Sequence, residues 1–278
     1  MAAMGSDQIV IPRVLIIAGS DSSGGAGIQA DIKTVTALGG YAMTAITAIT
    51  AQNTHGVFDI HAIPVQTIHS QMYAALSDIG ADAIKTGMLA TGEVIECVAE
   101  MIAERAPGAP RIIDPVMVAT SGDKLLAENA ISALKSLLVN GADLVTPNAP
   151  EAEILSGKAV ETVDGQRRAA EALLEAGAKA ALIKGGHIDG ATITDVLQTQ
   201  YEEHIFEGPR LVTNETHGTG CTLASAIATF IGAGKALPDA TAAGRTYLFD
   251  AIRNAPGFGS GPGPVDHGWN ISRVSLTE

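Results

Sequence analysis

The sequence predicts an α/β fold with a mainly parallel central sheet and helices on both faces. Strand patterns alternate with helix patterns along nearly the whole chain, as expected where parallel strands are joined by helical crossovers. Apolar residues make up 46% of the 278 residues and charged residues 17%, so the chain can bury a large core. The strand segments are apolar and rich in β-branched residues, which is typical of strands covered on both sides.

The individual elements follow from hydrophobic periodicity and from their start and stop signals. Strands are expected at 13–19, 41–52, 82–87, 111–116, 142–148 and 180–186, with an edge piece at 57–63 and a hairpin at 192–207. Helices are expected at 25–40, 64–80, 93–105, 127–138, 149–156, 163–176, 219–233 and 238–254. Two glycines close the first helix, and Pro64 suits the first turn of the second.

One domain covering residues 1–278 is the simplest organisation, because no long linker or low-complexity tract interrupts the alternation. Residues 1–11 are expected as an N-terminal extension and 255–278 as a Gly/Pro-rich tail over the surface. The first residues lack the basic and apolar regions of a signal peptide. The apolar run 222–234 is short and rich in small residues, which favours a buried helix over a membrane span.

The composition excludes several classes of partner. Thirty acidic and seventeen basic residues give a net charge of −13, which argues against nucleic acid and anionic membranes. Two cysteines are too few for a disulfide framework, so a reducing, cytoplasmic setting is expected. Cys97 lies on the apolar stripe of the 93–105 helix and is expected in the core, whereas the glutamates of that helix form a solvated face.

Polar residues follow most of the predicted strands, at the edge of a parallel sheet where ligands bind. Lys85, Asp114, Asn148 and Lys184 all stand at such strand ends, as do Gly19 and Gln52. Their convergence on one rim predicts a polar cleft.

The glycine-rich segment 19–31 permits two interpretations. Gly25 to Ala30 matches the G-x-G-x-x-A dinucleotide fingerprint, but the glycines lie six residues beyond the strand and no acidic residue follows the second strand. An NAD-binding site is therefore disfavoured. The alternative is a flexible loop that wraps a small ligand, with Asp31 in the first helical turn bonding that ligand or interacting with the helix dipole.

The sequence lacks a G-x-x-x-x-G-K-[ST] loop, an HExxH pair and a CxxC pair, which excludes a P-loop ATPase and disfavours a zinc site. Mg²⁺ needs fewer protein ligands. Asn148 and Glu151 could serve it from a strand–helix junction, although by themselves they form an ordinary N-cap pattern.

The segment 216–228, THGTGCTLASAIA, combines two glycines and a cysteine at the start of a helix. The first N–H groups of the helix could converge on an anion, and the dipole would lower the pKa of the Cys221 thiol. A Cys–His nucleophile is disfavoured, because His217 lies across a glycine turn. An anion-binding loop is the better interpretation.

Together these stretches resemble the ribokinase-like superfamily, and within it the hydroxymethylpyrimidine/phosphomethylpyrimidine kinases of thiamine biosynthesis. The matching stretches are AGSDSSGGAGIQADIKT, AITAQNTHGV, IKTGML, DPVMVATSGDKLL, TPNAPEAE, LIKGGH, NETHGTGCTLASAIA and GPGPVDH. They span nearly the whole chain. GPGPV stands where the family usually has GHGPV, and Ser22 where it usually has Pro.

The resemblance implies a three-layer ribokinase-like fold and a homodimer. It also implies Mg²⁺- and ATP-dependent phosphorylation of a pyrimidine hydroxymethyl group, first to the monophosphate and then to the diphosphate. By motif position, it places the pyrimidine against Gly19, Ala26, Asp31, Gln52, Met88 and Val116. It places the phosphates and Mg²⁺ near Asp114, Asn148, Glu151, Lys184 and Thr216, and the transferred group over Gly218, Thr219, Gly220 and Cys221. Whether Cys221 takes the hydroxyl proton or packs beneath the substrate stays open.

Parts of the sequence are compatible with three other functions. A pyridoxal kinase of the same fold would share the glycine loops, but Gln52 suits an aminopyrimidine edge, and pyridoxal has no exocyclic amine. An NAD-dependent oxidoreductase is the remote alternative. A non-catalytic pyrimidine-binding protein is disfavoured by the complete set of Asn148, Glu151 and Lys184.

Overall fold

The computed structural model describes residues 11–119, 122–123, 125–127 and 129–272. Its strands are β1 (Arg13–Asp21), β2 (Tyr41–Asn53), β3 (Gly56–Ala62), β4 (Ala83–Thr86), β5 (Arg111–Ile113), β6 (Leu144–Val145), β7 (Ala180–Ile183), β8 (Thr192–Thr199) and β9 (Glu203–Pro209). Its helices are α1 (Gly27–Ala37), α2 (Val65–Asp78), α3 (Gly92–Arg105), α4 (Ala130–Ala133), the π-helix η1 (Leu134–Val139), α5 (Ala149–Ser156), α6 (Val163–Glu175), α7 (Thr219–Gly232) and α8 (Leu237–Arg253).

Within these residues the strands form one nine-stranded sheet in the order β3-β2-β1-β4-β5-β6-β7-β8-β9. The six strands from β2 to β7 in that order are parallel, whereas β3 and β8 run in the opposite direction and β9 pairs antiparallel with β8. The mainly parallel sheet is thus confirmed. From β1 the chain first adds β2 and β3 on one side of the sheet and then adds β4 and the later strands on the other side. The order of the strands therefore reverses between β1 and β4, and ligands bind in the crevice at such a point.

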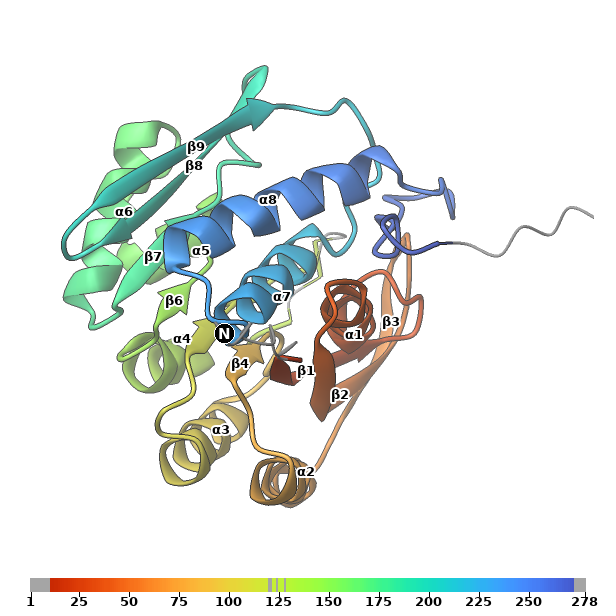
Figure 1. The fold of residues 1–278 in the computed structure, drawn as a ribbon, viewed down its shortest axis with the longest axis vertical. Helices are drawn as coiled ribbons and strands as arrows, with labels where there is room; N and C mark the ends of the chain where they lie inside the picture. Colours follow the sequence, from red (N-terminus) through yellow and green to blue (C-terminus); the bar gives the residue numbers. More distant parts are fainter. Residues whose placement is uncertain (1–10, 120–121, 124, 128, 273–278) are drawn as a thin grey trace, which may run out of the picture.

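Helices cover both faces of the sheet. One apolar core joins the sheet to α2–α6 and η1, and a second joins it to α1, α7 and α8. In Figure 1 the sheet runs as a twisted band between these two sets of helices. The two cores arise because successive side chains of a buried strand point to opposite faces: Leu15 and Ile17 enter the first core, Val14 and Ile16 the second.

Two predicted segments differ from the structure. The helix expected at 127–138 starts at Ala130 and widens into a π-helix from Leu134 onward. The segment expected as a surface tail is exposed at 256–260, but it packs into the fold further on, where Val265 and His267 are each 3% exposed and Pro264 pairs with His217. Residues 1–10 and 273–278 lie outside the described residues.

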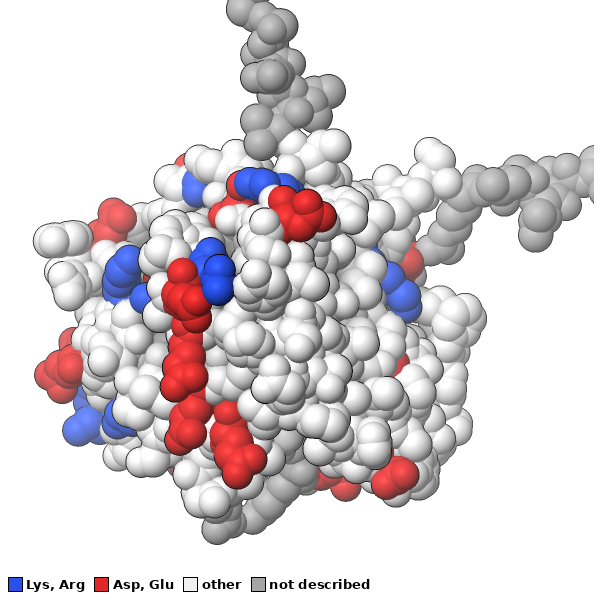
Figure 2. All heavy atoms as spheres, turned by 90° about the horizontal axis from the view of Figure 1, so that it is seen from below, with Lys and Arg blue, Asp and Glu red and all other residues white. Residues whose placement is uncertain are grey.

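The surface carries the acidic excess. The glutamates of α3 at 93, 96, 100 and 104 are exposed, and Cys97 between them is buried in the core, as the sequence predicted. Figure 2 shows a row of acidic side chains down the middle of the face seen from below in the view of Figure 1, with basic side chains toward the top and the sides. In the described part of the chain no helix has the length and apolarity to span a bilayer.

A wholly buried ion pair joins three elements of the second core. Lys85 Nζ at the end of β4 lies 2.9 Å from both carboxylate oxygens of Asp31 on α1, and neither side chain is exposed. Ser225 on α7 donates to the same carboxylate at 2.7 Å. Each charge is therefore satisfied by a partner from another element.

We expect Lys85→Met to destabilise the protein by about 3–5 kcal/mol, because it leaves the Asp31 carboxylate buried without its cation. The double variant Lys85→Met/Asp31→Asn should recover part of this loss. Urea unfolding followed by circular dichroism measures both, with Arg167→Gln, which breaks an exposed pair with Glu203, as a control of small effect. Equal stability of Lys85→Met and the parent would contradict the expectation.

Candidate active site

A cavity of about 630 Å³ lies at the carboxyl ends of the parallel strands. Its wall includes Gly19, Gln52, Asp114, Asn148 and Lys184, which follow or end five different strands. The predicted convergence is therefore confirmed for these five strand ends, but Lys85, near the end of β4, is wholly buried and does not line the cavity. Asp31 does not line it either. The other candidate residues in the cavity wall are Ala26, Met88, Val116, Glu151, Thr216, Gly218, Thr219, Gly220 and Cys221.

One end of the cavity is uncharged. Gly19 approaches Met88 so closely that a Cβ at Gly19 would lie 3.2 Å from the Met88 sulfur. Gln52 accepts at its Oε1 from the Thr50 hydroxyl at 3.1 Å, and its backbone N–H donates to Ser22 Oγ at 2.9 Å. This end therefore offers an apolar contact at Met88 and one oriented side-chain amide.

The centre of the cavity holds two carboxylates and one ammonium. Lys184 Nζ lies 3.2 Å from Asp114 Oδ1, which also accepts from Thr146 Oγ1 at 3.2 Å. Burial lowers the pKa of Lys184, but Asp114 and Glu151 outweigh it, so the pKa lies above its usual value. Asp114 Oδ2 is buried with no hydrogen-bond partner among the described residues.

Glu151 is held by the start of α5. Its Oε2 accepts from the Asn148 N–H, and its own N–H donates to Asn148 Oδ1, both at 2.9 Å. This reciprocal pair is a complete capping box, so the N-cap interpretation is confirmed. Burial raises the pKa of Glu151 to about 7, although Lys184 opposes the shift.

The opposite wall is the N-terminus of α7. Gly218 caps the helix with a φ of +80°, a conformation that favours glycine. The following N–H groups, of Gly220 and Cys221, stand where a helix has no internal acceptor. A Cβ on Gly220 would lie 3.4 Å from Lys184 Nζ and 3.8 Å from Asp114 Oδ2, so backbone donors, an ammonium and a carboxylate surround one space.

The structure corrects two expectations. Burial raises the pKa of Cys221 to about 12, and the nearby Lys85 only partly offsets it, so the thiol pKa is not lowered as the helix dipole suggested. Asp31 lies in the second turn of α1, which begins at Gly27, and both its oxygens bond Lys85. Since Asp31 is wholly buried, the structure does not bring it to the cavity wall.

A family model described as phosphomethylpyrimidine kinase matches residues 21–266. The chain belongs to this family. The resemblance inferred from the sequence motifs is thereby confirmed, and the NAD-dependent oxidoreductase is set aside.

Individual relatives agree with the family. A hydroxymethylpyrimidine/phosphomethylpyrimidine kinase of Streptomyces coelicolor is 46% identical over 94% of this chain and 96% of its own. A thiamine biosynthesis bifunctional protein of Geobacter sulfurreducens is 47% identical over 91% of this chain, which spans 52% of that protein. The pyridoxal kinase of Staphylococcus aureus, solved with ADP, superposes with a TM-score of 0.87 at 35% identity, covering 94% of this chain and 95% of its own.

Two parts of the site were not predicted from the sequence. One is the apolar end of the cavity, formed by Leu223 on α7 with Leu248, Phe249 and Ile252 on α8; their periodicity predicted a helix, but not which side faces a ligand. The other is the pair Asp21 and His217, both on the cavity wall. The two residues are 196 positions apart, so no local pattern in the sequence connects them.

Glu151→Gln should stabilise the unliganded protein at pH 8 and not at pH 4.5. The folded state raises the pKa of Glu151 from 4.5 to about 7, so the folded protein holds this proton more tightly. Stability is therefore lost as the pH rises from about 4.5 to above 7. The glutamine keeps the acceptor for Asn148 without the charge, so we expect a Tm higher by a few degrees at pH 8.

Thermal unfolding of both proteins at the two pH values measures this difference. Glu171→Gln removes a charge from the exposed face of α6 and serves as the matched control. A Tm difference that is the same at both pH values would contradict the raised pKa of Glu151.

Proposed function

We propose that this protein is a hydroxymethylpyrimidine/phosphomethylpyrimidine kinase. In this reaction ATP phosphorylates 4-amino-5-hydroxymethyl-2-methylpyrimidine to its monophosphate and then to the diphosphate, in thiamine biosynthesis. The observation that carries the proposal is the cavity itself. It joins an uncharged end with an oriented amide to a centre that combines an ammonium, two carboxylates and a helix N-terminus.

The uncharged end suits the pyrimidine. An aminopyrimidine edge presents an amine donor beside a ring-nitrogen acceptor, and the side-chain amide of Gln52 can bond both. Gly19, Ala26, Met88 and Val116 would pack on the ring. This arrangement would direct the hydroxymethyl group toward Cys221 and the start of α7.

The other end suits a nucleoside triphosphate. Leu223, Leu248, Phe249 and Ile252 offer an apolar surface of the kind that lines small-molecule sites. Lys184 and Thr216 would contact the phosphates, and Asn148 would orient Glu151 and bound water. Lys184 and the N–H groups of Gly218–Cys221 would stabilise the charge of the transferred phosphoryl group, because such transfer depends mainly on positioning and electrostatics.

The residues present fit a magnesium ion. The unpartnered Asp114 Oδ2 and the Glu151 carboxylate with its raised pKa are hard oxygen ligands, and the two carboxylates share the ammonium of Lys184. Across the described ranges, no cluster of three or more His, Cys, Asp or Glu side chains could hold a metal by itself. We therefore infer that Asp114 and Glu151 would hold Mg²⁺ together with the phosphates, where the ion would neutralise phosphate charge.

Two roles for Cys221 are distinguished by Cys221→Ser. A general base contributes about 10²–10⁴-fold to the rate, so a loss of that size would assign the proton transfer to the thiol. A loss below about 10-fold would assign it a packing role. In the unliganded chain the packing role is favoured, because a neutral thiol accepts no proton; the other role requires that ligands lower its pKa.

Pyridoxal phosphorylation is the second candidate, favoured by the superposition on a pyridoxal kinase. We expect kcat/KM for the hydroxymethylpyrimidine to exceed that for pyridoxal by at least about 10-fold, the factor that roughly 1.4 kcal/mol of lost hydrogen bonding makes. Phosphate transfer from ATP, measured with each substrate, decides between them. Asp114→Asn controls for contaminating kinases and should lose activity with both substrates.

A clear preference for pyridoxal would overturn the proposed substrate. Absence of turnover with either substrate would return the non-catalytic binding protein to consideration.

We further propose a cytoplasmic homodimer. The free thiols of Cys97 and Cys221 suit a reducing compartment that supplies ATP. Phe58 and Ile60, 70% and 41% exposed, share one face of the edge strand β3 and offer an apolar contact. Light scattering during size-exclusion chromatography should give about twice the chain mass of 28.3 kDa, and Phe58→Glu should shift it toward one chain. A parent protein that elutes as a monomer would contradict the dimer.

A further inference from the structure

The loop between β1 and α1 is built around one carboxylate. Asp21 Oδ1 accepts from the backbone N–H and hydroxyl of Ser23, each at 2.8 Å, and Oδ2 accepts from the Ala26 N–H at 2.8 Å. Burial raises the pKa of Asp21, but the bonds from His217, Ser23 and Ala26 outweigh it, so the pKa lies below its usual value. Asp21 is therefore an ionised acceptor that fixes the loop carrying Ala26.

His217 joins that loop to the start of α7. Its Nε2 lies 2.8 Å from Asp21 Oδ2, and the two side chains are only 5% and 3% exposed. Because an ionised carboxylate is an acceptor only, Nε2 carries the proton of this bond. His217 immediately precedes Gly218, the N-cap of α7. The bond between His217 and Asp21 therefore connects the loop between β1 and α1 directly to the anion-binding loop.

The two glycine loops also interlock sterically. A Cβ on Gly218 would overlap the carbonyl oxygen of Gly25, and a Cβ on Gly25 would overlap the His217 ring. The loops thus touch through positions where any side chain would push them apart.

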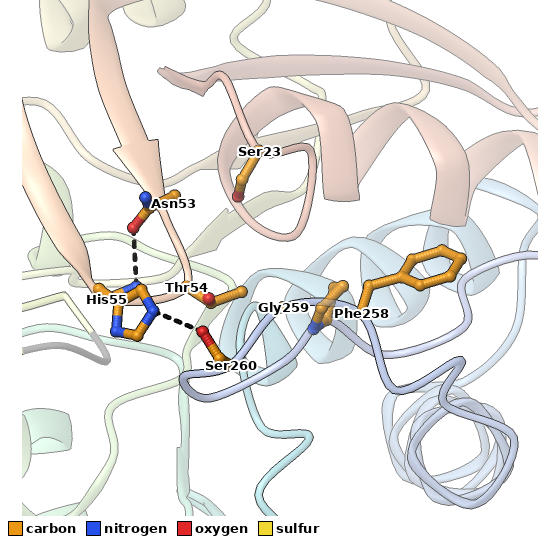
Figure 3. A pocket seen from close by; sticks show the side chains of 8 residues that line it. Ser23, Asn53, Thr54, His55, Phe258, Gly259 and Ser260 are labelled. Atoms are coloured by element: carbon orange, nitrogen blue, oxygen red, sulfur yellow. Dashed lines mark hydrogen bonds between the residues drawn. The ribbon is translucent and has the colours of Figure 1, made fainter.

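The C-terminal segment 258–264, here named the C-terminal strap, supports His217 from outside. Gly263 accepts from the His217 N–H at 3.0 Å, and Gly261 N–H donates to Thr54 Oγ1 at 3.2 Å. Ser260 Oγ lies 2.8 Å from His55 Nε2. Figure 3 shows this contact in a second cavity, of about 450 Å³, which Ser23 also lines. The strap therefore ties the β2–β3 turn to the residue that joins the two loops.

We propose that Asp21 and His217 act as a positioning pair. The pair holds the loop between β1 and α1, which carries Ala26, and the anion-binding loop at the start of α7 at the separation that direct phosphoryl transfer requires. The inference rests on the proposed function for its chemistry. Ala26 stands on the pyrimidine side and Gly218–Cys221 on the phosphoryl side, so this pair spans the reacting atoms. Productive transfer needs those atoms about 3–3.5 Å apart, and a misplacement of about 1 Å can cost roughly 10²-fold.

The test compares His217→Ala with His217→Gln. The alanine removes the link, whereas the glutamine amide reaches about as far as Nε2 and can donate to Asp21. We expect His217→Ala to lower kcat by roughly 10–100-fold, with KM for the pyrimidine and for ATP changed less than about threefold. It should also release more than one ADP per phosphorylated pyrimidine, because water then competes for the misplaced phosphoryl group. His217→Gln should restore most of both.

A second measurement does not depend on the reaction. In hydrogen exchange of the unliganded protein, His217→Ala should speed exchange in both 21–27 and 216–222. Asp21→Asn keeps one acceptor oxygen but loses the charge, so it should speed exchange in the same segments to a smaller degree. This variant replaces His217→Ala in the test if His217→Ala does not fold. His267→Gln is the matched control, because His267 is equally buried but does not join the loops, and it should leave the ADP ratio unchanged.

The outcomes separate the two proposals. A parent protein that does not phosphorylate the pyrimidine defeats the proposed function, and the exchange data then decide the positioning pair alone. A folded His217→Ala protein with kcat within twofold of the parent, one ADP per product and unchanged exchange would overturn the pair. So would His217→Gln as impaired in transfer as His217→Ala.

Discussion

The buried contact between Lys85, Asp31 and Ser225 is the constraint on which the site depends. It joins the end of β4, the middle of α1 and the first turns of α7, and those elements carry or adjoin the walls of the cavity. Separating a buried ion pair leaves a buried charge without its partner, which costs much free energy. The three elements therefore keep one relative arrangement. Lys85 also places a positive charge near Cys221 and Asp114, two residues that line the cavity.

A chain of net charge −13 can hold a polyphosphate because the positive groups are local. Lys184 and the free N–H groups at the start of α7 meet where Gly220 leaves room for an oxygen atom. Asp114 and Glu151 add negative charge at the same place, which raises the pKa of Lys184 and keeps it an ammonium. The same carboxylates make the site incomplete without a further cation, which fits a nucleotide bound together with Mg²⁺.

Much of the architecture could be predicted, because its signals are local. The helix at 149–156 was placed correctly since Asn148 and Glu151 form a capping box, and the β-branched run after Tyr41 gave β2. Two segments were not predicted. The π-helix after Ala133 is a hydrogen-bonding pattern that periodicity does not distinguish from an α-helix. The buried part of residues 255–272 looked like surface because its partners, such as His217 and Tyr247, are far away in sequence.

By itself the sequence determined the alternating strands and helices, the strand-end residues of the cavity and the glycine loops that identify the family. These depend on spacing within one segment. The tertiary structure alone decided that Asp31 faces Lys85 instead of the cavity, that burial raises the pKa of Cys221, and that Asp21 meets His217. Each of these depends on which distant groups surround a side chain, and desolvation and charge pairing are properties of that surrounding, not of the residue or its neighbours in the chain.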